Sequence, residues 1–204
     1  MSAVAPEISA TEAALHRVSK RKYTDRQIPR GELEQILVAA GAAPSAFNLQ
    51  PWRVKVVTDQ DVKNKLMAAA YNQPQVGGAS AVFVVYSDIQ DTLSNVEEIV
   101  HPGMRDRLEQ VVGMIQGSYG SLSTADQNNA ANAQTNIFLG YLLLILESRG
   151  WASSPMLGFE PPKVRELFGL KEDAPIAALV AVGEGAEEGF GQHRHKLERF
   201  VEFI

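Results

Sequence analysis

Apolar residues recur at helical spacing in two stretches near the start of the chain. The segment Ser9-Ala10-Thr11-Glu12 has the form of a capping box and predicts a helix that continues to about Val18. A second helix is expected to begin at Pro29, because proline is favoured in the first helical turn, and to end at Gly41. Its buried face is predicted to consist of Leu33, Ile36, Leu37 and Ala40.

Two continuous apolar runs predict strands that are buried on both faces. They extend from Ala79 to Tyr86 and from Ile176 to Val182, and a shorter run at Val54 and Val56 predicts another strand. Helical patterns cover 62–70, 126–149 and 161–168. Residues 91–124 contain one or two helical patterns, which Pro102-Gly103 and Gly117-Ser118-Tyr119-Gly120 are expected to break. Helices outnumber strands and no strand–helix–strand unit repeats, so the fold class is α+β, in one domain over residues 1–204.

Composition excludes several classes of function. The 204 residues carry a net charge of −5 at pH 7, whereas nucleic-acid backbones select basic surfaces. Cysteine is absent, which excludes disulfides and thiolate sites and is compatible with a reducing cytoplasm. The first ten residues lack the form of a secretory signal and are expected to be flexible. The longest apolar run, Ile137 to Leu146, is too short to span a bilayer, which favours a core or interface helix.

The loop from Ala43 to Trp52 combines turn formers with amide side chains and precedes a predicted strand. Ser45, Asn48 and Gln50 each offer hydrogen bonds at a defined place. Such a loop can be a structural turn whose amides cap backbone groups, or an anchored loop that carries binding groups.

Positive charge is concentrated in the segment from His16 to Lys22, directly after the first helix. Cations there oppose the negative end of the helix dipole, so the residues alone favour a solvated, stabilising cap. The alternative is a phosphate site, in which Arg17 donates paired hydrogen bonds, Ser19 supplies a hydroxyl and Arg21 adds a second positive charge.

Other segments carry weaker signals. From its residues alone, Tyr71–Val76 is predicted to be a plain loop, and Ser153–Phe159 is predicted to be a turn from which Met156 and Phe159 return to the core. The segment Gly183–Gly189 is rich in glycine, but it lacks the G-x-G-x-x-G spacing and holds three glutamates that would repel a pyrophosphate. The histidines lack metal-site spacing, so no metal is expected, and no side chain is identified that must act as a catalytic acid or base.

Four of these segments, in this order and spacing, resemble the FMN-dependent nitroreductase family. The resemblance extends from Arg17 to Arg194. It implies a mixed central β-sheet wrapped by helices and an intertwined homodimer with FMN at the subunit interface. The helix from Ile137 and a tail over 190–204 that crosses to the partner subunit would supply much of that interface.

The resemblance also implies roles for individual residues. By the match to the family's basic-x-Ser-x-basic segment, Arg17 and Ser19 bind the phosphate end of FMN, and Arg21 lies near N1 and O2. This chain has Val18 where a second basic residue is frequent. Pro44, Ser45 and Asn48 would reach the FMN that is bound mainly by the other subunit.

Three later segments complete the implied cofactor site. Asn72 and Gln75 correspond to polar residues that contact the flavin. The family's Pro-x-x-Gly-Phe loop matches Pro155, Met156, Leu157 and Gly158, with backbone N–H groups of the last two meeting flavin N5 and O4. Arg194 matches an arginine that closes over the phosphate, with Gln192 in place of a companion basic residue and Lys196 as a substitute.

The implied function is reduction of nitroaromatic, quinone or similar electron-poor acceptors by NADH or NADPH through bound FMN, in a ping-pong mechanism. A cation about 4 Å from N1 is worth roughly 4 kcal/mol at an effective dielectric near 20, before desolvation, and would raise the flavin potential. Two alternatives stay open. One is the same fold with another FMN reaction, such as ene reduction, dehalogenation, a peptide-azoline oxidation or flavin breakdown. The other is a dimeric flavin-binding protein without redox turnover.

Overall fold

The computed structural model describes residues 8–204, so the expected flexibility of residues 1–10 falls largely outside the described part of the chain. A sheet of four strands lies at its centre, in the order β1-β2-β4-β3. The strands are β1 (Trp52–Val57), β2 (Ala81–Ser87), β3 (Ala152–Met156) and β4 (Ile176–Gly183). All three pairings between these strands are antiparallel, and a parallel contribution comes from an isolated bridge between Ser19 and Ser153. The expected mixed sheet is therefore antiparallel in its named strands.

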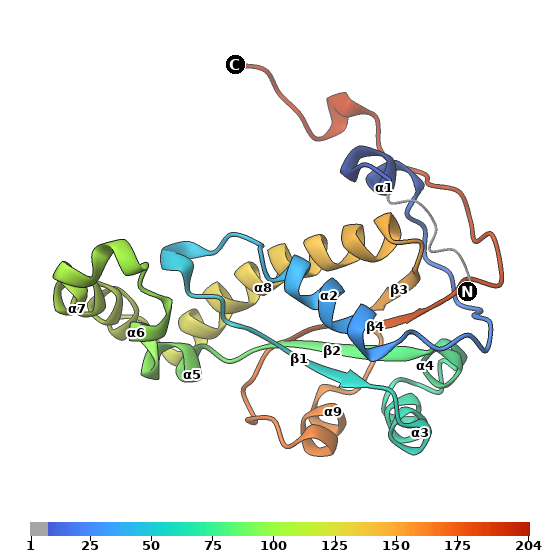
Figure 1. Cartoon of the computed structure of the whole chain (residues 1–204), viewed down its shortest axis with the longest axis horizontal. Helices are drawn as coiled ribbons and strands as arrows, with labels where there is room; N and C mark the ends of the chain where they lie inside the picture. The colour runs from blue at the N-terminus through green and yellow to red at the C-terminus, as the bar shows by residue number, and fades with distance from the viewer. Residues whose placement is uncertain (1–7) are drawn as a thin grey trace.

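Helices cover both faces of the sheet (Figure 1). On one face lie α2 (Arg30–Ala40) and α8 (Thr124–Ser148), with α1 (Ala10–His16) packed against α8. The other face carries α3 (Gln60–Ala69), α4 (Pro74–Gly78) and α9 (Pro161–Phe168). This arrangement confirms the α+β class and explains why β2 and β4 are apolar at nearly every position.

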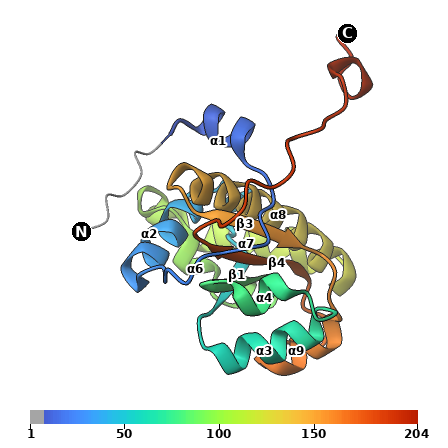
Figure 2. The ribbon, with the colours of Figure 1, turned by 90° about the vertical axis from the view of Figure 1, so that its right-hand side faces the viewer.

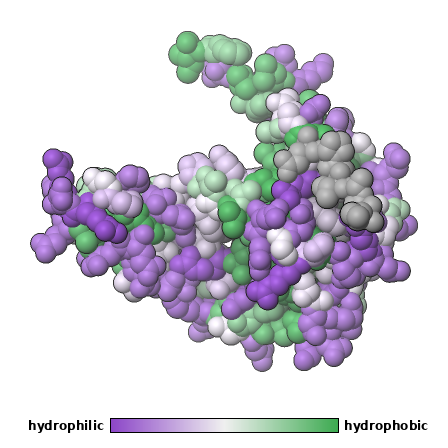
Figure 3. Space-filling model, in the orientation of Figure 1, coloured by the Kyte–Doolittle hydropathy of each residue, from purple (hydrophilic) through white to green (hydrophobic). Residues whose placement is uncertain are grey.

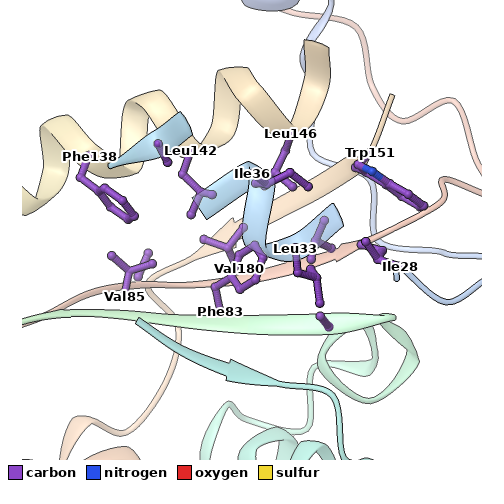
Figure 4. Packing of buried hydrophobic residues seen from close by; sticks show 14 of the residues in the cluster. Ile28, Leu33, Ile36, Phe83, Val85, Phe138, Leu142, Leu146, Trp151 and Val180 are labelled. Atoms are coloured by element: carbon purple, nitrogen blue, oxygen red, sulfur yellow. The ribbon is translucent and has the colours of Figure 1, made fainter. Parts of the chain in front are cut away.

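Alternate residues of β2 supply two different cores. Phe83 and Val85 pack with α2 and α8, whereas Val82 and Val84 pack with α3 and α9. Figure 4 shows the first of these cores, with Phe138, Leu142 and Leu146 of α8 pointing toward the sheet. The ring of Phe138 also stacks on Trp52, with the ring centroids 5.3 Å apart. Trp52 is partly buried against this core and anchors the start of β1 there.

A helical lobe projects from one end of the sheet (Figure 1). It contains α5 (Ile89–Ser94), α6 (Val96–Ile99), the 3-10 helix η2 (Pro102–Arg107) and α7 (Leu108–Gly120). The break expected at Gly117–Gly120 falls at the end of that range, because α7 continues through Gly117 to Gly120 and α8 begins at Thr124. Ile115 and Tyr119 of α7 are buried in a separate apolar cluster with Leu49 and Ile89, and this burial outweighs the low helix propensity of the glycines.

Local signals placed most element boundaries correctly. Ser9 and Glu12 form both hydrogen bonds of the capping box, and Gly41 is the C-cap of α2. Gly169 ends α9 with a φ of 61°, which glycine adopts without strain. One prediction is wrong: Ser153-Ser154-Pro155-Met156 forms most of strand β3 rather than a turn. As an edge strand, β3 tolerates proline.

The last segment of the chain leaves the body of the molecule. It contains a short 3-10 helix, η3 (Leu197–Arg199), and Phe200, Phe203 and Ile204 are exposed. Figure 2 shows this segment passing beside the stretch that follows α1 before it extends outward. Apolar atoms mark its end in Figure 3. Among the helices of residues 8–204, none is long and apolar enough to cross a membrane.

Candidate cofactor site

The basic segment after α1 is held in extended form beside the sheet. Ser19 forms the bridge to Ser153, and the backbone N–H of Lys20 donates to the carbonyl oxygen of Ser153 at 3.2 Å. Tyr23 bridges to Gly185, and its hydroxyl donates to the carbonyl oxygens of Lys20 and Ala181. Since successive side chains of an extended chain point to opposite sides, Arg17, Ser19 and Arg21 are placed on one side of the segment.

Two buried polar atoms without a partner lie on the two segments that this bridge joins. They are Nη1 of Arg17 and Oγ of Ser153, neither of which has a hydrogen bond within the described chain. A buried guanidinium nitrogen without an acceptor is costly, so the site is suited to a ligand that brings anionic oxygens. Ser19 is half-buried and Arg21 is exposed beside it.

A half-buried carboxylate lies close to these cations. Burial raises the pKa of Glu147, near the end of α8, while Lys20, Arg17 and His16 lower it by their positive charge. Because the pKa of Glu147 is raised overall, the basic residues compensate only in part for its burial. Local sequence patterns do not predict this interaction, because Glu147 is about 130 positions away from Arg17 along the chain.

The stretch 71–76 was predicted to be a loop, but its second half forms the start of α4, and the stretch meets the end of β3 in space. Nε2 of Gln73 donates to the carbonyl oxygen of Gly158 at 2.6 Å. Gln75 is buried and uses its amide nitrogen toward Oε1 of Gln73 and Sδ of Met156. Tyr71 and Asn72 both have positive φ, at 53° and 55°, which is a strained conformation for two consecutive non-glycine residues. The side chain of Asn72 is exposed.

Two backbone donors are presented where β3 ends. Leu157 and Gly158 are exposed, and no hydrogen bond among residues 8–204 uses their N–H groups. A Cβ at position 158 would lie 3.2 Å from Nε2 of Gln73, so glycine permits the close approach of the two loops. Pro155 is half-buried and Met156 is buried, so these two residues pack beneath the exposed end of β3 rather than lying on its surface.

The loop before β1 lies at the other end of α8, beside the helical lobe (Figure 1). Oγ of Ser45 accepts from the N–H of Gln50 at 3.0 Å, and Nδ2 of Asn48 donates to the carbonyl oxygen of Ile99. Gln134 of α8 accepts from the N–H of Ala46 through Oε1. Pro44 is exposed. Within one chain, therefore, the structure does not bring Pro44, Ser45 and Asn48 together with the basic segment.

This loop is strained and firmly anchored. Phe47, Asn48 and Gln50 all have positive φ. Nη1 of Arg53 donates to the carbonyl oxygens of Gln50 and Trp52, and the Arg53 guanidinium pairs with Asp91 of α5. Strain of this kind persists only where the surrounding structure over-determines the conformation, which is typical of binding loops.

The C-terminal tail contacts the basic segment through Gln192 rather than through Arg194. Nε2 of Gln192 donates to the carbonyl oxygens of Ala14 and Arg17, at 2.8 and 2.9 Å, and so caps the end of α1. Arg194 is exposed, and its Nη1 donates to the carbonyl oxygen of His193. Lys196 is also exposed, so neither cation is placed at the basic segment within this chain.

A contribution that sequence reasoning missed comes from the glycine-rich segment 183–189. Beyond the bridge of Tyr23 to Gly185, Oε1 of Glu187 accepts from the backbone N–H of Arg21 at 2.7 Å. The segment is thus a support for the basic segment, although it lacks a phosphate-binding spacing of its own. No cluster of potential metal-ligating side chains occurs in the part of the chain that the structure describes.

Comparison with known proteins identifies relatives over nearly the whole chain. The sequence model of a family described as the Nitroreductase family matches residues 14–184. A Thermus thermophilus protein named NADH dehydrogenase is 46% identical over 202 residues, covering 98% of each chain. A Lactiplantibacillus plantarum protein named CLA biosynthesis enone reductase is 27% identical, covering 95% of this chain and 93% of its own. A candidate nitroreductase of Exiguobacterium sibiricum, solved in complex with FMN, superposes with a TM-score of 0.91 at 26% identity, covering 99% of this chain and 100% of that one.

Proposed function

The chain belongs to the nitroreductase family and is an oxidoreductase of that type, and on this premise we propose that it binds FMN and uses NADH or NADPH to reduce electron-poor acceptors. The acceptors proposed are nitroaromatics, quinones and similar compounds. When bound, FMN would accept a hydride from the nicotinamide and pass the electron pair to the acceptor in a ping-pong sequence. The residues of the chain bind the cofactor, orient it and stabilise the charge that reduction adds.

The observation that carries this proposal is the presence of unused hydrogen-bond donors at both ends of β3, suited to the two ends of one ligand. At one end lies the unpartnered guanidinium nitrogen of Arg17, beside Ser19 and its bridge to Ser153. At the other end are the two unused N–H groups of Leu157 and Gly158. From Ser153 to Leu157 a strand extends about 13 Å. A ligand with a phosphate at one end and a hydrogen-bonding ring at the other matches this distribution of donors.

Each residue then has a role that its chemistry suits. Arg17 and Ser19 would hold the phosphate and the ribityl chain through charge-assisted and hydroxyl hydrogen bonds. Leu157 and Gly158 would donate their backbone N–H groups to N5 and O4, a role that does not depend on side-chain identity. Arg21 would lie near N1 and O2, with the exposed amide of Asn72 as a further contact. Gln75 would contribute only after releasing its hydrogen bonds to Gln73 and Met156.

A homodimer would complete the site. The loop that carries Ser45 and Asn48 lies far from the basic segment of its own chain, so a second copy is the natural source of these groups (Figure 1). Ile137 and Tyr141 of α8 are 44% and 41% exposed, one helical turn apart. The apolar end of the tail at 190–204 is exposed as well (Figure 3), and we propose that it crosses to the partner subunit, which would also bring Arg194 to a phosphate.

The first experiment is the absorbance spectrum of the purified protein, recorded before and after NADH is added without air. Flavin bands that bleach on addition of NADH or NADPH support the proposal. Flavin bands that persist with both reductants refute the proposed electron donor. A colourless protein that cannot be reconstituted with FMN refutes the cofactor assignment.

A pair of variants tests the phosphate assignment. Arg17→Ala removes a guanidinium that would make charge-assisted hydrogen bonds, worth about 1.5–3 kcal/mol, so FMN affinity should fall by about ten- to a hundredfold. Lys22→Ala is the matched control, because Lys22 has the same charge and lies in the same extended segment but on its other side. Equal loss of FMN affinity in both variants would show that Arg17 acts only through net charge.

A second candidate reaction is ene reduction of an activated carbon–carbon double bond. It is favoured by the similarity to the enone reductase of Lactiplantibacillus plantarum, which covers 95% of this chain. Both reactions use the same flavin and the same backbone donors, so they differ only in the acceptor. Anaerobic turnover with a panel of nitroaromatics, quinones and enones, compared by kcat/KM, separates the two.

A further inference from the structure

The glycine-rich segment after β4 forms a second extended partner for the basic segment. The N–H of Thr24 donates to the carbonyl oxygen of Glu184 at 2.9 Å, and the N–H of Ala186 donates to that of Lys22 at 2.9 Å. These bonds lie on either side of the bridge between Tyr23 and Gly185. The position of the basic segment is therefore set by residues that lie more than 150 positions away along the chain.

Two glycines in this segment make room for side chains of the basic segment. A Cβ at Gly183 would lie 3.0–3.1 Å from three atoms of Tyr23, and one at Gly185 would lie 2.9 Å from Cδ of Lys20. At Gly189 the φ of 75° adds a conformational reason for glycine. The spacing of the glycines thus reflects packing against the basic segment, which explains why it does not follow a nucleotide-binding motif.

Glu187 is the acidic residue that this packing brings to Arg21. Its Oε1 accepts the backbone N–H of Arg21 at 2.7 Å, and Glu187 itself is half-buried. Both charges act on the neighbouring Tyr23: burial raises the pKa of its phenol, Glu187 raises it further, and Arg21 lowers it. The Arg21 side chain forms no ion pair within residues 8–204, so its guanidinium is available to a ligand, while the Glu187 carboxylate holds the backbone of the same residue.

We propose that Glu187 is a positioning residue for Arg21 and sets the reduction potential of the bound flavin. The proposal rests on the function proposed above, in which Arg21 lies at the N1 and O2 edge. Transfer of a hydride from the nicotinamide to the flavin leaves one negative charge at that edge and releases the oxidised nicotinamide. Arg21 stabilises this charge, whereas the Glu187 carboxylate opposes it and fixes the backbone from which Arg21 extends.

Two substitutions separate the two parts of the role. In Glu187→Gln the amide oxygen can still accept the N–H of Arg21, but the negative charge is gone. The affinity for oxidised FMN should then change by less than about twofold, while the affinity for reduced FMN rises by about tenfold. For a two-electron couple this ratio raises the midpoint potential by about 30 mV.

In Glu187→Ala both the hydrogen bond and the charge are lost. Arg21 is no longer held, so the affinity for oxidised FMN should fall by about five- to tenfold, with a smaller rise in potential than in Glu187→Gln. Glu188→Gln is the matched control, because Glu188 is the exposed neighbour of Glu187 and its substitution removes the same charge. Its affinity and potential should stay close to those of the wild type.

The experiment measures FMN dissociation constants and midpoint potentials by anaerobic spectroelectrochemical titration of the full-length holoprotein. A higher potential in Glu187→Gln than in Glu188→Gln, with unchanged affinity for oxidised FMN, supports the proposal. If the wild-type protein binds FMN and is reduced by NADH, but the two variants have equal potentials, only the proposed role of Glu187 is overturned. A wild-type protein that binds no FMN overturns the proposed function, and this inference with it.

Discussion

The ion pair between Glu32 of α2 and Arg149 at the end of α8 gives a sharp test of how the two helices are held together. Nε of Arg149 donates to Oε1 of Glu32 at 2.7 Å, and Nη2 donates to Oε2 at 2.9 Å. Nε1 of Trp151 donates to the same carboxylate at 3.2 Å. The Arg149 and Glu32 side chains are only 19% and 17% exposed, so solvent screens the pair weakly.

Glu32→Gln keeps one acceptor oxygen but places an amide NH₂ group against the guanidinium. Loss of one partner from a well-buried pair costs about 3–5 kcal/mol, and a single hydrogen bond to a charged group is worth about 1.5–3 kcal/mol. Because one acceptor remains, we expect a loss of about 2–3 kcal/mol in the free energy of unfolding. At about 2.1 cal/mol/K of unfolding entropy per residue over 204 residues, Tm falls by about 5–7 °C.

The pH dependence provides an independent check. Hydrogen bonding from Arg149 lowers the pKa of Glu32 below its ordinary value of 4.5, against burial, with Trp151 contributing in the same direction. A lowered pKa in the folded state means that the stabilisation is present above pH 4.5 and is lost as the pH falls through the folded-state value. The difference in Tm between wild type and Glu32→Gln should therefore be full at pH 7 and should shrink below pH 4.5.

Differential scanning calorimetry at one fixed protein concentration measures both effects. Glu34→Gln is the control, because Glu34 lies on the same helix and pairs with Arg30 while the two side chains are 60% and 91% exposed. That variant should lose less than about 0.5 kcal/mol. A Glu32→Gln variant that unfolds within about 1 °C of the control, or a difference that does not respond to pH, would refute the reasoning.

Three further predictions follow from burial and packing. Burial raises the pKa of Glu147, so its ionised form lowers the free energy of unfolding as the pH rises above 4.5. Glu147→Gln should therefore raise Tm at pH 8 but not at pH 4, measured by circular dichroism melts. Phe138→Ala removes a ring that is 2% exposed and stacked on Trp52, and urea titration should show a loss of about 3–5 kcal/mol. Gly183→Ala places a Cβ 3.0 Å from Tyr23, which should cost about 1–3 kcal/mol and weaken FMN binding measured by fluorescence.

Local rules were reliable where the determining contacts are close in sequence. The capping box at Ser9 and the N-terminal proline and C-terminal glycine around α2 were all placed correctly, because caps are satisfied within a few residues. The continuous apolar runs likewise predicted β2 and β4, because a strand covered by helices on both faces needs apolar side chains on both.

The helical lobe shows where local rules were less exact. Gly117–Gly120 predicted a break, but burial of Ile115 and Tyr119 in the lobe core keeps α7 helical through Gly117 until Gly120. Tyr119 is accordingly a core residue, and its hydroxyl accepts a hydrogen bond from Nε2 of Gln134.

The candidate site, too, could be predicted from the sequence only in part. The sequence by itself determined which residue types are present: the alternating basic segment, the amide-rich loop and the family resemblance that orders them. Only the tertiary structure decided that Ser153–Met156 is a strand, because Ser-Ser-Pro-Met has little strand propensity until β4 offers a partner. Only it brought Glu187 to Arg21, since a contact across 166 positions depends on the path of the whole chain and leaves no periodic signal in the sequence.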